Sequence, residues 1–311
     1  MNYPVNQALI QNSVILDNAA VCGYLNASLS ANTLRAYRDD LQHFQNWGGT
    51  LPTTSEQIAC YLAHYAQGLT VATLTRRLAS LSKLHNIKQW PNPVSTELVR
   101  VTFRGIRNQH GVKQRQVAPA IKEDIMAMVN NLQGIKAIRD KALLLIGFAG
   151  AFRRSELASL QYSDIQFVLQ GVLIHLRRSK TDQAREGRKI AIPYARGIAC
   201  PVIALREWLQ LSGITEGPIF RNVNCHGQIG AQIISPQSIA LVIKERAKAA
   251  GLDSSQYSGH SLRAGLITSA AQAGVSSWKI RQQTGHKSDA MLQRYIRDAN
   301  IFTDNAAGGV L

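Results

Sequence analysis

The stretch Ala151-Phe152-Arg153-Arg154-Ser155-Glu156-Leu157 closes the longest apolar run of the chain and carries the first polar cluster of its second half. The apolar run, residues 142–152, is about half of the roughly 20 residues that a membrane-spanning helix needs. We therefore expect a buried core helix, with the Arg-Arg-Ser-Glu cluster at its end.

Two further polar clusters follow in the same half of the chain. His260-Ser261-Leu262-Arg263 stands at an expected helix start, and Gly285-His286 is followed by Tyr295. Each cluster alone has an ordinary explanation, since an arginine three residues before a glutamate is usually a helix ion pair. Likewise, a surface His-x-x-Arg and a core tyrosine are common. Their occurrence together, in this order, favours a functional site instead.

Taken together, these motifs resemble the tyrosine recombinase (phage integrase) family, in particular its Cre/Xer-like two-domain members. The resemblance covers about residues 30–297. The family carries an arginine box, a hairpin lysine, a His-x-x-Arg box, a Gly-His pair and a tyrosine in this order. It implies that the catalytic residues are Tyr295, Arg153, Arg263, His260, Lys180, His286 and Glu156.

The arginines suit the chemistry that the resemblance implies. Attack on a DNA phosphodiester adds negative charge to two non-bridging oxygens, and a planar guanidinium can bind two oxygens at once. We expect Arg153 and Arg263 to hold the phosphate and His286 to donate a hydrogen bond to it. His260 lies one helical turn from Arg263, so both side chains face one reactive centre. Glu156 would orient these groups.

The tyrosine and the lysine complete the expected reaction. A phenol with an ordinary pKa of about 10 is a weak nucleophile unless cations or a base activate it, and His260 and the arginines would do this for Tyr295. Lys180, in the turn of a predicted hairpin, would protonate the departing 5′ oxygen. The 3′-phosphotyrosine keeps the bond energy, so we expect neither ATP nor a metal nor any other cofactor.

Two of these site-residue assignments, the first arginine and the lysine, have alternatives. Arg154 follows Arg153 where the family usually has an apolar residue, so a shift of register would exchange the two; the Arg-x-Ser-Glu spacing favours Arg153. The connection that holds Lys180 also holds Arg185, Arg188 and Lys189. The lysine is therefore the least constrained assignment.

Composition supports a nucleic-acid partner. The 311 residues carry a formal net charge of +16 and have a pI near 10.0, which indicates a surface for a polyanion. Hydrophobic residues at 45% and charged residues at 17% exclude an intrinsically disordered chain. The first residues lack the pattern of a secretory signal, and the four cysteines contain no CxxC pair. We expect a cytoplasmic protein without a zinc site.

The chain divides into two predicted domains. Residues 110–119 contain glycine and proline without apolar periodicity, which is typical of a linker. We expect residues 1–115 to form a helical core-binding (SAM-like) domain with Arg76-Arg77 exposed at its edge, and residues 116–311 the catalytic domain. Helices are expected at residues 30–48, 54–67, 71–90, 96–108, 121–132, 135–151, 201–211, 236–250, 261–273, 276–284 and 289–297.

The predicted fold class is mainly α with a small β-sheet (α+β), because residues 172–178 and 188–193 have the pattern of a hairpin. The two domains would close around DNA as a clamp. The resemblance implies a site-specific recombinase that acts as a homotetramer on double-stranded DNA with short inverted repeats, through a Holliday junction. Three alternatives remain: a type IB topoisomerase, a non-catalytic DNA-binding protein of this fold, and a basic membrane-surface protein.

Overall fold

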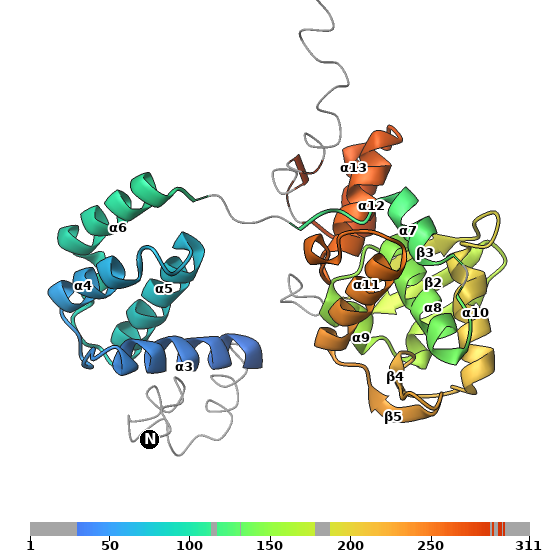
Figure 1. Cartoon of the computed structure of the whole chain (residues 1–311), viewed down its shortest axis with the longest axis horizontal. Helices are drawn as coiled ribbons and strands as arrows, with labels where there is room; N and C mark the ends of the chain where they lie inside the picture. The colour runs from blue at the N-terminus through green and yellow to red at the C-terminus, as the bar shows by residue number, and fades with distance from the viewer. Residues whose placement is uncertain are drawn as a thin grey trace, which may run out of the picture. The chain divides into compact units, whose positions relative to one another are not determined.

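The computed structural model describes residues 30–112, 117–130, 132–177 and 187–286, together with residues 288, 292, 293 and 295. Packing divides the chain into two units, residues 1–115 and 116–311 (Figure 1). The fold is mostly helical with two small antiparallel sheets, which confirms the predicted fold class. Across the described residues, no helix has the length and apolar character that crossing a bilayer requires.

The first unit is a helical bundle that follows the predicted helices closely. Hydroxyl side chains cap the first three helices that the structure describes in this unit, beginning with Ser30, whose Oγ accepts a hydrogen bond from the Thr33 amide at 3.1 Å. The described elements of this unit are α3 (Ala31–Asn46), α4 (Ser55–Tyr65), α5 (Val71–Ile87), the short 3-10 helix η1 (Pro93–Ser95) and α6 (Glu97–His110).

Two expectations for this unit were wrong. The third helix ends at Ile87 and not at Trp90, because Gln89 adopts a φ of 55° that stops the helix. Arg77 is buried and not exposed: its Nη1 donates to the Tyr61 hydroxyl at 2.7 Å, and its Nε lies 3.7 Å from the Asp40 carboxylate. Arg77 therefore stabilises the core of this unit.

The second unit contains the predicted hairpin, extended by a strand that the sequence analysis missed. Strands β1 (Ile165–Val168), β2 (Gly171–Leu176) and β3 (Arg188–Pro193) form an antiparallel sheet in the order β1-β2-β3. Alternate residues of β2 and β3 are buried, as period-two patterning requires. A second pair, β4 (Arg221–Val223) and β5 (Ile229–Ile233), was also missed.

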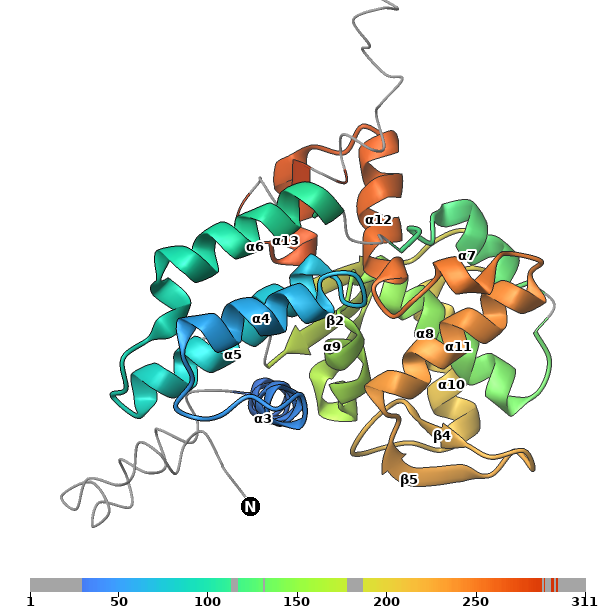
Figure 2. The same ribbon diagram turned by 60° about the vertical axis from the view of Figure 1, so that its left-hand side comes forward.

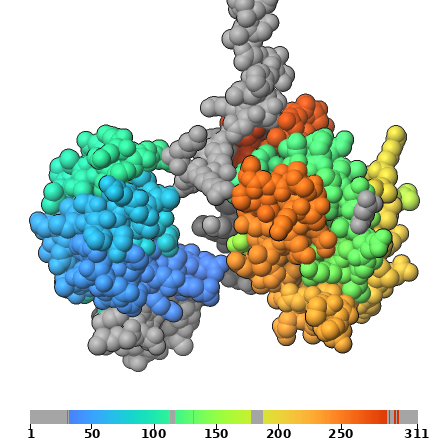
Figure 3. Space-filling view, viewed as in Figure 1, coloured from blue at the N-terminus to red at the C-terminus, as the bar shows by residue number. Residues whose placement is uncertain are grey.

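The helices of this unit pack against one another beside the sheet (Figure 2). Helix α8 packs against α10 and α12, and α11 packs against α7 and α9. The surface of α11, in orange, faces the viewer in Figure 3. The helices of the unit are α7 (Lys122–Met128), α8 (Ile135–Ala149), α9 (Arg154–Ser159), η2 (Tyr162–Asp164), α10 (Pro201–Ser212), α11 (Pro236–Ala249), η3 (Ser254–Gln256), α12 (Ser261–Gln272) and α13 (Ser277–Thr284). Helix α7 is shorter than predicted. The helix expected at residues 289–297 lies largely outside the described residues.

The sequence analysis placed the arginine cluster at the end of the buried helix. In the structure the cluster instead begins a separate helix, α9. Helix α8 stops at Ala149, and Ala151 then adopts a φ of 49°, which redirects the chain. Arg153 becomes the N-cap of α9, where the Glu156 side chain accepts a hydrogen bond from the Arg153 amide at 2.9 Å. This break moves Arg153 out of the helix α8 register.

The start of the second unit is fastened to α12. The Ala120 amide donates to the Ser261 carbonyl at 2.9 Å, and the Ala118 amide donates to the Gln256 carbonyl at 2.8 Å. Gly265 makes this approach possible, because a Cβ at this position would lie 1.7 Å from the Ala120 carbonyl oxygen. The missing side chain of Gly265 therefore holds the first segment of this unit against the helix that carries Arg263.

We predict that Gly265→Ala destabilises the protein by about 1–3 kcal/mol, because the backbone of residue 120 must move to admit the methyl group. The measurement is the denaturation midpoint of the full chain. Gly230→Ala is the control, since its Cβ would lie 3.6 Å from the nearest neighbouring atom, the Asn222 carbonyl oxygen. Equal midpoints for the two variants would contradict the prediction.

Candidate active site

The first component of the site is an ion pair within α9. Arg153 Nη1 lies 2.5 Å from Glu156 Oε1, and the Glu156 side chain is buried. Burial alone would raise the pKa of Glu156, but hydrogen bonds from the Arg153 amide and side chain and the charges of Arg153 and Arg188 outweigh it and lower this pKa. Glu156 is therefore an ionised carboxylate that holds Arg153.

Arg263, on α12, is almost completely buried, with 1% of its surface exposed. Its Nη1 donates to the Ala151 carbonyl at 2.7 Å. Burial, followed by the positive charge of Arg153, lowers the pKa of Arg263 to about 10, so it stays charged at neutral pH. The left-handed backbone of Ala151 thus supplies the acceptor that positions a buried guanidinium.

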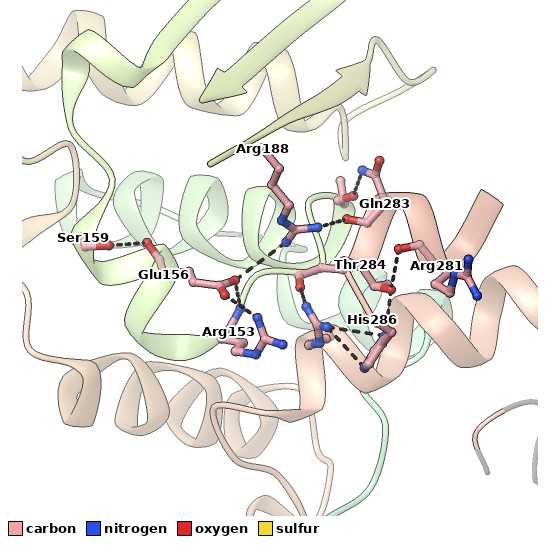
Figure 4. A network of polar contacts seen from close by, with 11 residues as sticks. Arg153, Glu156, Ser159, Arg188, Arg281, Gln283, Thr284 and His286 are labelled. Carbon is pink, nitrogen blue, oxygen red and sulfur yellow. Dashed lines mark hydrogen bonds and ion pairs between the residues drawn. The ribbon is translucent and has the colours of Figure 1, made fainter. Parts of the chain in front are cut away.

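His286 lies against Arg263. Arg263 Nη2 donates to His286 Nε2 at 3.2 Å, and His286 Nδ1 lies 2.8 Å from the Thr284 hydroxyl oxygen (Figure 4). Arg263 Nη2 also lies 3.4 Å from Nδ1. The shorter contacts, to Nε2 and to Thr284, are both satisfied when Nε2 accepts from Arg263 and the Nδ1 N–H donates to the Thr284 hydroxyl. Burial and the charge of Arg263 lower the pKa of His286 to about 4, so the ring is neutral at pH 7.

His260 and Tyr295 form the third contact. The Tyr295 hydroxyl lies 2.7 Å from His260 Nε2. Burial, followed by the charges of Arg263 and Arg153, lowers the pKa of His260, which favours the neutral ring. A neutral Nε2 without a proton accepts the phenolic hydrogen, and this is the geometry of a tyrosine next to a base.

Six of the seven predicted residues lie among the described residues, and the contacts link them in three groups: Arg153 with Glu156, Arg263 with His286, and His260 with Tyr295. Lys180 and Arg185 lie outside the described residues. Arg154 is exposed, so the geometry favours Arg153 as the inward arginine.

Two contributing groups were missed from the sequence, the Ala151 carbonyl and the Thr284 hydroxyl, and Arg188 was named only as an alternative to Lys180 and not as a partner of Glu156. Only Thr284 left a usable signal, since a hydroxyl two residues before a histidine can reach its ring. The position of a carbonyl depends on backbone conformation and cannot be inferred from residue type.

Within the described ranges, no group of three or more His, Cys, Asp or Glu side chains gathers as a metal site. Cys200 is buried, Cys60 and Cys225 are exposed, and all three are free thiols.

Comparison with known proteins identifies the family. Residues 117–300 match the model of the phage integrase family, and residues 24–91 match that of the phage integrase N-terminal SAM-like domain. The chain belongs to the phage integrase family. The resemblance based on the sequence motifs is therefore confirmed, and this integrase-family chain is a tyrosine recombinase.

Two relatives illustrate the relationship. An integrase/recombinase XerD homolog of Selenomonas ruminantium is 39% identical over 316 residues, covering 97% of this chain and 93% of the relative. The recombinase Cre of Escherichia phage P1 is 28% identical over 273 residues, covering 81% of this chain and 78% of Cre.

Solved structures of recombinases share the fold. XerH site-specific recombinase, in a post-cleavage complex with palindromic difH substrate, has a TM-score of 0.62 and 18% identity and covers 96% of this chain and 92% of its own. A lambda integrase dimer bound to a COC′ core site also has a TM-score of 0.62 and 18% identity, covering 94% of this chain and 77% of its own. At these identities the likeness concerns the fold.

We predict that His286 makes stability depend on pH. Its pKa is about 4 in the folded chain against a usual value of 6.5. As the pH falls, the unfolded chain therefore binds a proton at a higher pH than the folded chain does, and this protonation favours unfolding. The free energy of unfolding should fall as the pH decreases from about 6.5 to about 4, and fall less steeply in His286→Asn. Carboxylates such as Glu156 contribute to both proteins and cancel in the difference. Parallel stability profiles would contradict the prediction.

Proposed function

We propose that this recombinase cleaves and rejoins double-stranded DNA at specific sites through a 3′-phosphotyrosine made by Tyr295. The observation that carries the proposal is the 2.7 Å contact between the Tyr295 hydroxyl and His260 Nε2, three residues from the buried Arg263. A phenol that donates to a neutral imidazole beside a permanent cation has both a base for its proton and a charge for its oxyanion.

In the proposed step, the Tyr295 oxygen attacks the phosphorus and its proton passes to His260. The bond from phosphorus to the 5′ oxygen breaks, and that oxygen leaves with a proton, giving a 5′ hydroxyl and a 3′-phosphotyrosine. Rejoining is the reverse attack by a 5′ hydroxyl. The phosphotyrosine conserves the energy of the phosphodiester, so the exchange needs neither ATP nor a metal.

Arg153 and Arg263 would bind the non-bridging oxygens of the phosphate. Both are prepared for this role, because Glu156 and the Ala151 carbonyl fix the guanidinium groups before DNA arrives. Removing one such preorganised donor typically costs about 10²–10³ in rate. Glu156 contacts no reacting atom and acts as a positioning residue.

His286 would donate a hydrogen bond to a non-bridging oxygen, which requires a change from the contact seen here. Its Nε2 now accepts from Arg263. When a phosphate oxygen replaces His286 as the acceptor for Arg263 Nη2, the Thr284 hydroxyl can donate to Nδ1 instead, since a hydroxyl is both donor and acceptor. The Nε2 proton then points at the phosphate. Thr284 would therefore support the change of tautomer.

Lys180 is the proposed general acid for the 5′ oxygen, on the motif resemblance alone. Both units would bind DNA, residues 1–115 as the helical core-binding domain and residues 116–311 as the catalytic domain, closing around the duplex as a clamp. Relatives of this chain are recombinases crystallised on DNA, one of them a lambda integrase tetramer bound to a Holliday junction. We extend this to a homotetramer that acts in the cytoplasm on short inverted repeats.

We predict that Tyr295→Phe forms no covalent DNA adduct and still binds DNA, because only the nucleophilic oxygen is lost. Wild type and variant are incubated with duplexes cut from the DNA flanking the gene, and adducts are separated on denaturing gels. A covalent adduct formed by Tyr295→Phe would contradict the assignment of Tyr295 as the nucleophile. Relaxation of supercoiled DNA without recombinant products would favour the topoisomerase alternative.

We predict that Lys180→Ala slows cleavage by about 10²–10⁴-fold and that a 5′-bridging phosphorothiolate duplex restores it. A sulfur leaving group needs no acid, since a thiol has a pKa of only about 8.5. Tyr295→Phe is the control and should stay inactive on this duplex, because a better leaving group does not compensate for a missing nucleophile. If the phosphorothiolate duplex restores cleavage by Lys189→Ala and not by Lys180→Ala, the general acid is Lys189.

A further inference from the structure

Arg188 is the first residue of β3 and turns towards the site. In the sheet register it lies opposite Leu176, at the end of the β2–β3 hairpin where the connection between the two strands begins. The next residue, Lys189, is exposed, whereas the Arg188 side chain is only 19% exposed. Because side chains alternate along a strand, Arg188 faces the interior of the unit.

The Arg188 guanidinium lies between two parts of the site that are distant in sequence. Its Nη1 donates to the Gln283 carbonyl at 2.7 Å, and its Nη2 lies 3.8 Å from Glu156 Oε2 (Figure 4). The Gln283 side chain in turn donates to the Ala149 carbonyl at 2.8 Å. One side chain thus connects α9 with the last turn of α13.

The backbone before His286 is shaped to admit this side chain. Gly285 adopts a φ of 67°, and a Cβ at this position would lie 2.8 Å from Arg188 Nη1. Any other residue there would displace the guanidinium or the turn. The guanidinium therefore packs directly on the turn that carries His286.

Two donors of Arg188 lack an acceptor within the described part of the chain. Its Nε and Nη2 are buried and have no hydrogen-bond acceptor among the residues that the structure describes. Such groups are costly and call for an explanation. The Glu156 carboxylate lies within ion-pair distance of Arg188 Nη2, but its shorter contact is with Arg153. Arg188 is therefore in position to share this carboxylate with Arg153.

We propose that Arg188 is a positioning residue for strand cleavage, which fixes Glu156 relative to the Gln283–His286 turn and so keeps the carboxylate in place beside Arg153. The inference rests on the proposed function. A planar fork suits this arrangement, because it presents Nη1 to the Gln283 carbonyl and Nη2 to Glu156, whereas a lysine would have to reach both acceptors from one nitrogen. Burial lowers the pKa of Arg188, and the charge of Glu156 offsets this shift only in part.

The experiment compares Arg188→Met and Arg188→Lys with wild type on a duplex that wild type cleaves. We expect adduct formation at saturating protein to be about 10–100-fold slower with Arg188→Met, as for a small misplacement of reacting groups, with unchanged DNA affinity. Arg188→Lys, which keeps the charge and one contact, should fall between them. Arg196→Met, which removes an exposed arginine after β3, is the matched control and should cleave normally.

A double variant tests whether Arg188 acts through Glu156. If it does, Arg188→Met combined with Glu156→Gln should be scarcely slower than Glu156→Gln alone, because interacting residues are not additive. Multiplied losses would overturn the proposal, as would equal losses of affinity and rate. If Arg188→Met does not fold, the same comparisons apply to Arg188→Lys.

Amide hydrogen exchange gives a readout independent of the reaction. Loss of the Arg188 contact should speed exchange in the last turn of α13 and leave α10 unchanged. Exchange at the wild-type rate there would overturn the proposal. A wild type that forms no adduct overturns the proposed function and this inference with it, whereas a reactive wild type with an unaffected Arg188→Met overturns this inference alone.

Discussion

The buried carboxylate of Glu156 is the interaction on which the site depends. Arg153 and Arg188 both pair with it, and the charges of both act on Arg263. Burying guanidinium groups without a partner carries a large desolvation cost, and removing one partner of such a pair leaves the other uncompensated. An ionised Glu156 therefore lets the fold keep several positive charges at one place, away from water and ready for an anion.

The same desolvation sets the protonation of the histidines. Burial and neighbouring arginines lower the pKa of both His260 and His286, so each ring is neutral and has one nitrogen that accepts. His260 uses this nitrogen for the Tyr295 hydroxyl, and His286 uses it for Arg263. The positive field that would bind a phosphate thus also helps to keep the base unprotonated.

Backbone features bring these groups together. The left-handed residue Ala151 ends α8 and aims a carbonyl at Arg263, while Gly265 lets residues 118–120 pack on α12 and Gly285 makes room for Arg188. The sequence analysis recognised most helices, because apolar periodicity and N-cap hydroxyls are local signals. It extended α8 through Ala151 because an alanine gives no warning of a positive φ. It placed Arg77 on the surface because burial of a charge depends on a partner, Asp40, from another helix.

The sequence alone determined the fold class, the family and the identity of the candidate site residues, because the order and spacing of chemically unusual residues survive in the linear chain. Only the tertiary structure decided which of these residues touch one another. It pairs Glu156 with Arg153 and not with Arg154, His286 with Arg263 and Thr284, and Tyr295 with His260. It also brought Arg188 between α9 and α13, far from both along the chain. Contacts of this kind depend on strand register and helix ends, which many distant residues set together.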